Sequence, residues 1–240
     1  MPGLWSLLVV LTASCGVTEP DVGAHARGKA ESDCKLCSDE TVVKLAAASR
    51  RYALDLYRAV AAEQGGGNLA LAPAALYLGW GMLQLAARDG TADEIGHHVL
   101  VPGAEQDLPE GEALHQGLAK LGRVWAELEV LSWGRRLFVD ERFEDHASKD
   151  FVEGLETAFD SSPEWLDCSG DAEAQREAIN AWAAGDERSA GKVKGLYPDD
   201  ETINDETTVV LASARALGLP WAEPFAAGKG PFRQADGKQA

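Results

Sequence analysis

The chain has 240 residues, and 45% of them are hydrophobic, which is enough apolar material for a core and excludes a globally disordered protein. The formal net charge is −17 at pH 7. Nucleic-acid binding depends on clustered Lys and Arg side chains that contact phosphates, so this charge argues against a nucleic-acid partner. We interpret the acidity as a feature that keeps the protein soluble.

Residues 1–16 are predicted to be a secretory signal peptide. An apolar stretch over residues 4–12 is followed by small residues, and it is too short to span a bilayer. The sequence Leu-Thr-Ala-Ser-Cys that ends at Cys15 resembles a bacterial lipobox, in which the Cys becomes lipidated. Cys15 is therefore a lipidation candidate, and the alternative is a Cys within an ordinary cleaved signal. We expect a secreted, extracellular protein, or one held at a bacterial envelope by this lipid anchor alone.

Residues 17–40 are polar and rich in Gly, Ala and Ser, which is typical of a flexible linker. Within this segment, Cys34 and Cys37 form a C-x-x-C motif. A redox motif would need a neighbouring βαβ pattern and a zinc site would need a second pair, and the sequence offers neither. In a secreted protein a local disulfide is the plainest interpretation, and it leaves Cys168 as a free, half-buried thiol.

Helices are predicted next, from apolar residues that recur every three or four positions. Three Gly residues at 65–67 end the first helix. The second follows Pro73 and is apolar nearly all round, which predicts burial at the centre of a domain. Thr91 and Glu94 predict a capping box at the start of the third. A short strand is expected at residues 68–71, and the helices are expected over residues 41–63, 74–87, 91–99 and 112–129.

The rest of the chain alternates strands with helices, which indicates an α+β fold. Runs rich in Val, Leu and Phe predict the strands. A stripe that includes Ile179 and Trp182 predicts the last helix. The strands are expected over residues 131–140, 164–167 and 207–217, and the helices over residues 142–159 and 171–184.

The sequence carries no recognisable catalytic or metal-binding constellation. His97 and His98 are adjacent, so on a helix they point about 100° apart and cannot share a metal. Motifs of zinc proteases, serine hydrolases and nucleotide-binding proteins do not occur. The acidic run at residues 199–201 is expected to be a solvated turn. We therefore expect no enzyme and no metal site.

Several motifs between residues 41 and 240 resemble segments of the serpin family, in the family's order and spacing. In serpins an Asn-led strand meets Ser-Pro-x-Ser, and a buried helix follows and ends near Gly-Ala-x-Gly-x-Thr. Later motifs are similar to the end of strand 2A, to helix F, to a Gly-Lys-Ile turn, and to the aromatic residues and loop after strand 3A. The matching segments are residues 68–73, 85–91, 137–140, 179–182, 191–193, Trp221, Phe225 and residues 232–238.

This resemblance implies an α+β, serpin-like fold, in which N-terminal helices pack on a mixed central sheet A that is incomplete at the C-terminus. Residues 41–240 would form a partial serpin domain, a divergent N-terminal portion that follows the signal peptide and the linker. The abundance of Ala and Gly and the excess of acidic residues over Lys are typical of a GC-rich genome and favour a bacterial source. The family-signature structural positions are Thr91, Asn180, Trp182, Gly191, Trp221 and Phe225.

The resemblance also implies a function. Serpins inhibit serine, and sometimes cysteine, proteases without a cofactor. The protease cleaves an exposed reactive loop, which then inserts into the central sheet as a new strand. The family places that loop beyond residue 240, so we expect no reactive-site bond in this chain and no inhibition unless a full-length form exists. The alternative is a non-inhibitory binding or chaperone protein on a serpin scaffold.

The sequence departs from the family in the shutter, the region where the central sheet opens. Ala72 and Ala75 stand where serpins have Ser, and Ser213 stands where they have Asn. Replacing hydroxyls by methyl groups is neutral only if their partners have also changed. Arg215, in the same strand, needs a partner or solvent because an unpaired buried charge is costly. The shutter equivalents are Asn68, Ala72, Pro73, Ala75 and Ser213.

Overall fold

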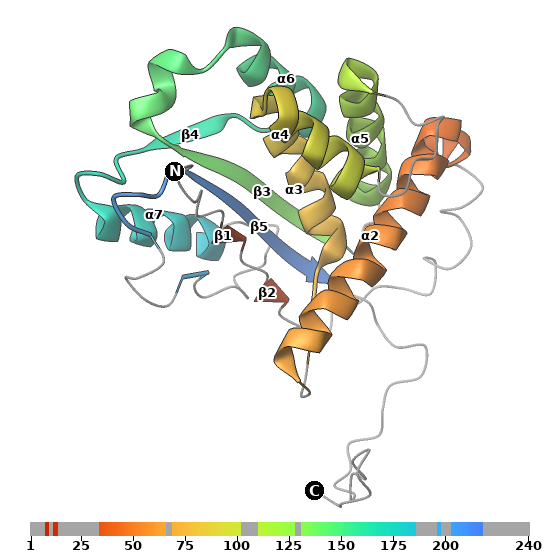
Figure 1. Cartoon of the computed structure of the whole chain (residues 1–240), viewed down its shortest axis with the longest axis horizontal. Helices are drawn as coiled ribbons and strands as arrows, with labels where there is room; N and C mark the ends of the chain where they lie inside the picture. Colours follow the sequence, from red (N-terminus) through yellow and green to blue (C-terminus); the bar gives the residue numbers. More distant parts are fainter. Residues whose placement is uncertain are drawn as a thin grey trace, which may run out of the picture.

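The computed structural model describes residues 8–9, 12–13, 34–65, 69–101, 110–127, 131–185, 196–197 and 203–217, with the backbone alone at residues 8–9, 12–13, 131–133 and 214–217. Its helices lie around one sheet (Figure 1). In chain order the elements are β1 (Leu8–Val9), β2 (Thr12–Ala13), the 3-10 helix η1 (Lys35–Ser38), α2 (Glu40–Gln64), α3 (Pro73–Ala86), α4 (Asp89–Glu94), the π-helix η2 (Ile95–Leu100), α5 (Gly111–Ala126), β3 (Leu131–Asp140), the 3-10 helix η3 (Glu141–His146), α6 (Lys149–Phe159), β4 (Pro163–Leu166), α7 (Ala172–Gly185) and β5 (Val209–Leu217).

The five strands form a mixed sheet in the order β1-β5-β3-β4, with β2 also paired to β5. β3 and β5 are antiparallel, with Leu137 opposite Leu211. β3 and β4 are parallel, with Leu137 opposite Pro163. A helix-rich first half packed on a mixed sheet is the α+β arrangement that the sequence predicted.

Both faces of the sheet are buried. Successive side chains of β3 point to opposite faces, and each set joins a different apolar cluster. Leu137 and Val139 join the larger apolar cluster, which contains buried residues of α2, α3, α5 and α6. Phe138, between them, belongs to the second cluster together with Ile179 of α7. α7 therefore covers the face opposite to the one that the first helices cover.

The edge of β5 that lies away from β3 is paired with the N-terminal segment. Leu8 lies opposite Val210 in β1, and Thr12 lies opposite Ala214 in β2, both in parallel orientation. These residues fall within residues 1–16, whose assignment as a signal peptide stays a prediction. The lipidation candidate Cys15 lies outside the described residues.

The linker predicted over residues 17–40 is folded in the part that the structure describes. The 3-10 helix η1 covers four of these residues, and α2 begins at Glu40. The Asp39 carboxylate caps α2 by accepting from the backbone N–H groups of Thr41 and Val42, at 3.0 and 3.2 Å. Asp39 also accepts from Lys120 Nζ of α5 at 2.7 Å, so this short segment is tied to the helical layer. The predicted end of α2 is confirmed, since Gly65 is its C-cap with φ of 64°.

Three other predicted elements differ in the structure. Thr91 does not begin a helix: α4 starts at Asp89, and its N-cap, Arg88, makes no side-chain cap bond. The predicted capping box is therefore wrong, and Thr91 lies inside the helix, which continues as a π-helix rather than as an α-helix. The helix predicted over residues 142–159 is split into η3 and α6, because Ser148 caps α6 by accepting from the Phe151 N–H at 3.2 Å. Residues 69–71, predicted as strand, have no strand pairing.

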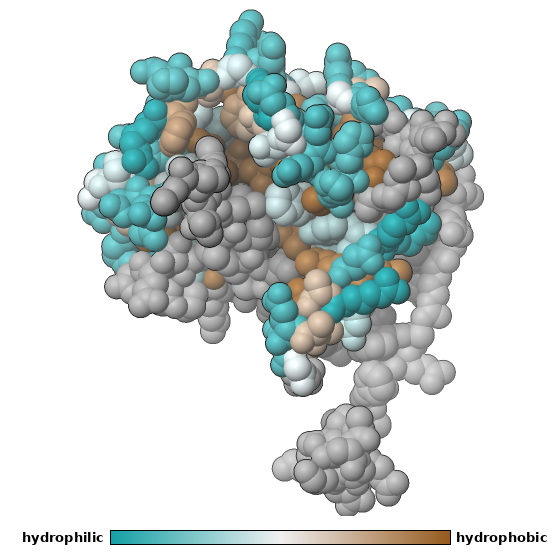
Figure 2. Space-filling model, in the orientation of Figure 1, coloured by the Kyte–Doolittle hydropathy of each residue, from teal (hydrophilic) through white to brown (hydrophobic). Residues whose placement is uncertain are grey.

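Hydrophilic residues cover much of the outer side of α2 in the space-filling view, and apolar surface appears between α2 and the sheet (Figure 2). Among the described helices, none combines the length and the apolar character needed to cross a bilayer.

Cys168 is free and only 2% exposed, so the prediction of a half-buried thiol is corrected to a buried one. Burial, with a smaller contribution from the Asp140 carboxylate, raises the pKa of the Cys168 thiol to about 11. The thiolate, which is the nucleophile, is therefore scarce at neutral pH.

We expect iodoacetamide at pH 7.5 to leave Cys168 unmodified in the folded chain and to modify it after unfolding in urea. Mass spectrometry of the tryptic peptide measures both. Raising the pH toward 11 should increase the rate in the folded chain as the thiolate forms. Equal rates in the folded and unfolded chains at pH 7.5 would contradict the burial.

Candidate functional site

Three of the predicted shutter equivalents, Ala72, Pro73 and Ala75, lie at the start of α3, and Ser213 lies on β5 of the sheet. Pro73 occupies the first position of α3, where its missing N–H costs no helical bond. Ala72, the N-cap, offers no side-chain bond, and its carbonyl accepts from the Ala75 N–H at 3.0 Å. Ala75 is buried, with 2% of its surface exposed. Backbone bonds thus close the turn without a hydroxyl at either position.

Two glycines allow α3 to approach its neighbours, and the sequence interpretation missed both. A Cβ at Gly79 would overlap Leu211 Cδ2 of β5, and a Cβ at Gly81 would lie 2.7 Å from Leu118 Cδ1 of α5. The signal that could have identified them is a Gly-x-Gly inside an otherwise apolar helix, because Gly there lowers helix propensity and needs a packing reason.

Ser213 lies two residues after Leu211 on β5 and therefore on the same face of the sheet. Its hydroxyl is buried and has no hydrogen-bond partner among the described residues. Its cross-strand neighbour is Arg135 of β3, whose Nη2 donates to the Phe159 carbonyl at the end of α6 at 3.5 Å. A polar pair thus lies at the edge of the apolar core, where the first helices meet the sheet.

The outer edge of β5 can be identified from the backbone hydrogen bonds. The Asp140 N–H donates to the Thr208 carbonyl at 2.9 Å. Because backbone groups alternate along antiparallel strands and the register is regular, Val210 and Ala212 direct their backbone groups toward β3. Leu211 and Ser213 direct theirs to the opposite edge, where the two-residue strands β1 and β2 pair. The outer edge of β5 is therefore the edge that β1 and β2 occupy, through backbone groups that β3 does not use.

Asn180 of α7 holds a distant segment against the sheet. Its Oδ1 accepts from the backbone N–H groups of Leu196 and Tyr197 at 2.7 and 2.9 Å, and its Nδ2 donates to the Tyr197 carbonyl at 2.9 Å. Arg176 Nη1 donates to the same carbonyl at 2.7 Å. Leu196 and Tyr197 are 3% and 1% exposed, so these bonds satisfy backbone groups that water does not reach.

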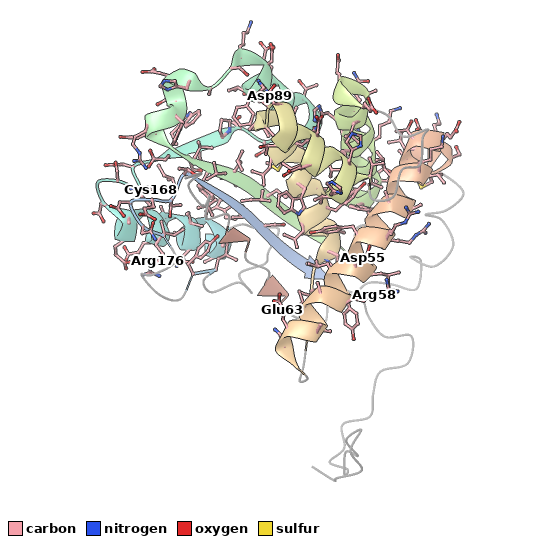
Figure 3. The ribbon with its side chains drawn as sticks, viewed as in Figure 1. Asp55, Arg58, Glu63, Asp89, Cys168 and Arg176 are labelled. Carbon is pink, nitrogen blue, oxygen red and sulfur yellow. A yellow bond between two sulfur atoms is a disulfide. The ribbon has the colours of Figure 1, made fainter. Side chains whose placement is uncertain are left out.

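Trp182, the second signature residue of α7, joins the helix to β3. Its ring meets Phe138 edge to face, with centroids 5.6 Å apart. The Arg136 guanidinium lies 5.6 Å from the centroid of the Trp182 ring and pairs with Glu164 of β4. Arg176 projects from the same helix, and Cys168 lies in the segment that precedes this helix (Figure 3). Asn180 and Trp182 thus hold α7, and the segment after it, over β3 and β5.

A cavity of about 740 Å³ opens where α6, β4 and the end of α7 meet β3. Two arginines and two carboxylates line it, so their formal charges cancel. The lining residues include Gly134, Arg135, Arg136, Asp160, Ser161, Ser162, Pro163, Glu164, Trp182 and Gly185.

The structure does not bring all the singled-out residues together. Thr91 is exposed on α4. Asn68, Gly191, Trp221 and Phe225 lie outside the described residues, as does the side chain of Arg215. Within the described ranges, His, Cys, Asp and Glu side chains form no group of three that could hold a metal ion.

Comparison with known proteins gives a consistent family. The family model described as "Serpin (serine protease inhibitor)" matches residues 47–239. Leukocyte elastase inhibitor of Sus scrofa is 25% identical over 193 residues, which cover 79% of this chain and 49% of that protein. Serpin B7 of Homo sapiens is 24% identical over 190 residues, covering 77% and 49%. The chain spans about half the length of the curated relatives it matches.

Solved structures show the same fold. The chain matches a tumour-suppressing serpin with a TM-score of 0.69 and 21% identity, covering 83% of this chain and 53% of that one. It matches an Arabidopsis serpin in its native stressed conformation with a TM-score of 0.67 and 16% identity, covering 84% and 50%. The predicted arrangement of helices on a mixed sheet A is therefore confirmed as serpin-like.

Proposed function

Because the chain belongs to the serpin family, we propose that it provides the strand-accepting scaffold of a protease inhibitor, and not an enzyme. The observation that carries this proposal is the outer edge of β5, where Leu211 and Ser213 direct their backbone groups away from β3 and toward short added strands. Serpin inhibition, as the resemblance describes it, requires a central sheet that gains a strand. α7, held by Asn180 and Trp182, covers the face beside that edge.

The target that we propose is a serine protease, with a cysteine protease as the second choice. Support comes from two relatives named leukocyte elastase inhibitor, from Sus scrofa and Xenopus tropicalis, at 25% and 26% identity. We further propose that the 240-residue chain alone does not trap a protease, since it spans about half of those relatives. We also propose that the protein is secreted or is held at a membrane by a lipid on Cys15, and that its source is bacterial.

Incubation with leukocyte elastase tests this function. After equimolar mixing, an SDS gel reports any covalent complex and a chromogenic peptide reports the remaining elastase activity. We expect no complex and full activity with the 240-residue chain. A covalent complex would contradict the inactivity of the chain but would support the inhibitor. If a longer form with an exposed reactive loop trapped no serine or cysteine protease, the inhibitor would be contradicted and a non-inhibitory binder favoured.

A further inference from the structure

A disulfide joins Cys34 and Cys37 immediately before α2, and the inhibitor scaffold gives it no role. It closes the four-residue turn of η1, which backbone bonds already hold: the Cys37 N–H donates to the Cys34 carbonyl at 3.1 Å, and the Asp39 N–H to the Leu36 carbonyl at 3.1 Å. The stabilisation from a disulfide grows with the length of the loop it closes, so a crosslink across three positions adds little to the fold.

The two sulfurs differ in their surroundings. Cys37 is exposed and Cys34 is half-buried, whereas Cys168, the free cysteine of the described residues, is fully buried. The Cys37 N–H also lies 3.1 Å from Cys34 Sγ and donates to it. A hydrogen bond to sulfur stabilises the thiolate over the thiol. Cys34 is therefore the better leaving group, and Cys37 is the sulfur that a reagent reaches first.

We propose that Cys34 and Cys37 form a redox-active pair that exchanges with small thiols of the glutathione type. The thiolate of the reagent attacks Cys37 Sγ, and the bond between the two protein sulfurs breaks. Its electron pair passes to Cys34 Sγ, and the Cys37 N–H donates a hydrogen bond to the resulting thiolate. A second reagent thiolate attacks the reagent sulfur of the mixed disulfide. Cys37 leaves as a thiolate, and the two reagent molecules are joined as their disulfide.

In the net reaction, one protein disulfide is reduced and two reagent thiols are oxidised to one disulfide. The two protons lost by the reagent thiols are available to the Cys34 and Cys37 thiolates, which bind them to an extent set by the pH. The sequence alone offered no context for redox chemistry at this C-x-x-C. The structure adds the exposed Cys37 and the N–H donor on Cys34, which together assign separate roles to the two sulfurs.

Variants of the full chain that keep one cysteine of the pair test these roles. The Cys34→Ser variant retains only Cys37 of the pair, and the Cys37→Ser variant retains only Cys34. Each variant is incubated with oxidised glutathione at pH 7. In Cys37→Ser, whose backbone N–H is retained, iodoacetamide should alkylate Cys34 with a pH midpoint below that of free cysteine. Cys37→Pro removes this N–H and should return the midpoint to that of free cysteine. Mass spectrometry of the wild-type chain in glutathione buffers should show Cys34 and Cys37 reduced and reoxidised reversibly.

At neutral pH Cys168 serves as the internal control, because its alkylation there would report unfolding of any variant. In wild type under limiting glutathione, we expect the mixed disulfide on Cys37 at least ten times more often than on Cys34. Three results would each overturn the proposal while Cys168 stays protected: a pair that stays oxidised in glutathione buffer, equal mixed disulfide on both sulfurs, or a Cys34 midpoint that Cys37→Pro does not change. The proposal does not depend on protease inhibition, and the elastase assay does not affect it.

Discussion

Replacing Phe138 by Ala is expected to lower the free energy of unfolding by about 3–5 kcal/mol, the usual cost of removing a buried aromatic side chain. Phe138 is 1% exposed and packs edge to face with Trp182. It belongs to the cluster that joins β3 and β5 to α7, together with Ile179 and Val210. The substitution would leave a cavity between the sheet and α7, and urea unfolding followed by tryptophan fluorescence and circular dichroism measures the loss.

The matched control is Phe143→Ala, which removes the same side chain from η3, where it is 40% exposed. We expect this variant to change the free energy of unfolding by about 0.5 kcal/mol or less. A similar effect of the two substitutions would show that the face of the sheet under α7 is not packed as described.

Asn180→Ala is expected to cost about 2–6 kcal/mol, because two buried backbone N–H groups lose their acceptor and each unsatisfied group costs about 1–3 kcal/mol. These groups belong to Leu196 and Tyr197. The Tyr197 carbonyl keeps its bond from Arg176, so the loss concentrates on the two donors. The measurement is amide exchange, in which the N–H groups of residues 196 and 197 should lose protection before β3 and β5 do.

Asn180→Asp provides the comparison, since a carboxylate still accepts from both N–H groups and loses only the donor to the Tyr197 carbonyl. It should retain most of the protection at residues 196 and 197. If Asp and Ala at this position reduced the protection equally, the side-chain amide oxygen would not be the group that holds the segment.

The sequence predicted the helices and strands that have strong internal patterns. β3 was predicted over the residues that form it, and α2 and α3 within one residue at each end, because alternation, a Gly-rich stop and Pro73 are local signals. α4 was mispredicted because Thr91 and Glu94 satisfy a capping pattern that the chain does not use. Local sequence cannot show that Asp89 adopts a φ of 48° and starts the helix two residues earlier.

The site was predictable only in part. Asn180 and Trp182 were selected as signature positions, but their partners, Tyr197 and Phe138, are 17 and 44 residues away and depend on the tertiary fold. The close approach at Gly79 depends on Leu211, more than a hundred residues later. Both cysteines of the disulfide were identified, whereas the N–H of Cys37 that distinguishes them appears only in the folded turn.

Residue-resolved amide exchange in β5 tests most directly that its outer edge accepts added strands. The full chain is compared with a variant that begins at residue 17 and so lacks β1 and β2. We predict faster exchange at the Leu211 and Ser213 amides, which face the outer edge, and unchanged exchange at Val210 and Ala212, which face β3. Unchanged exchange at all four amides, or an equal increase at all four, would contradict the account.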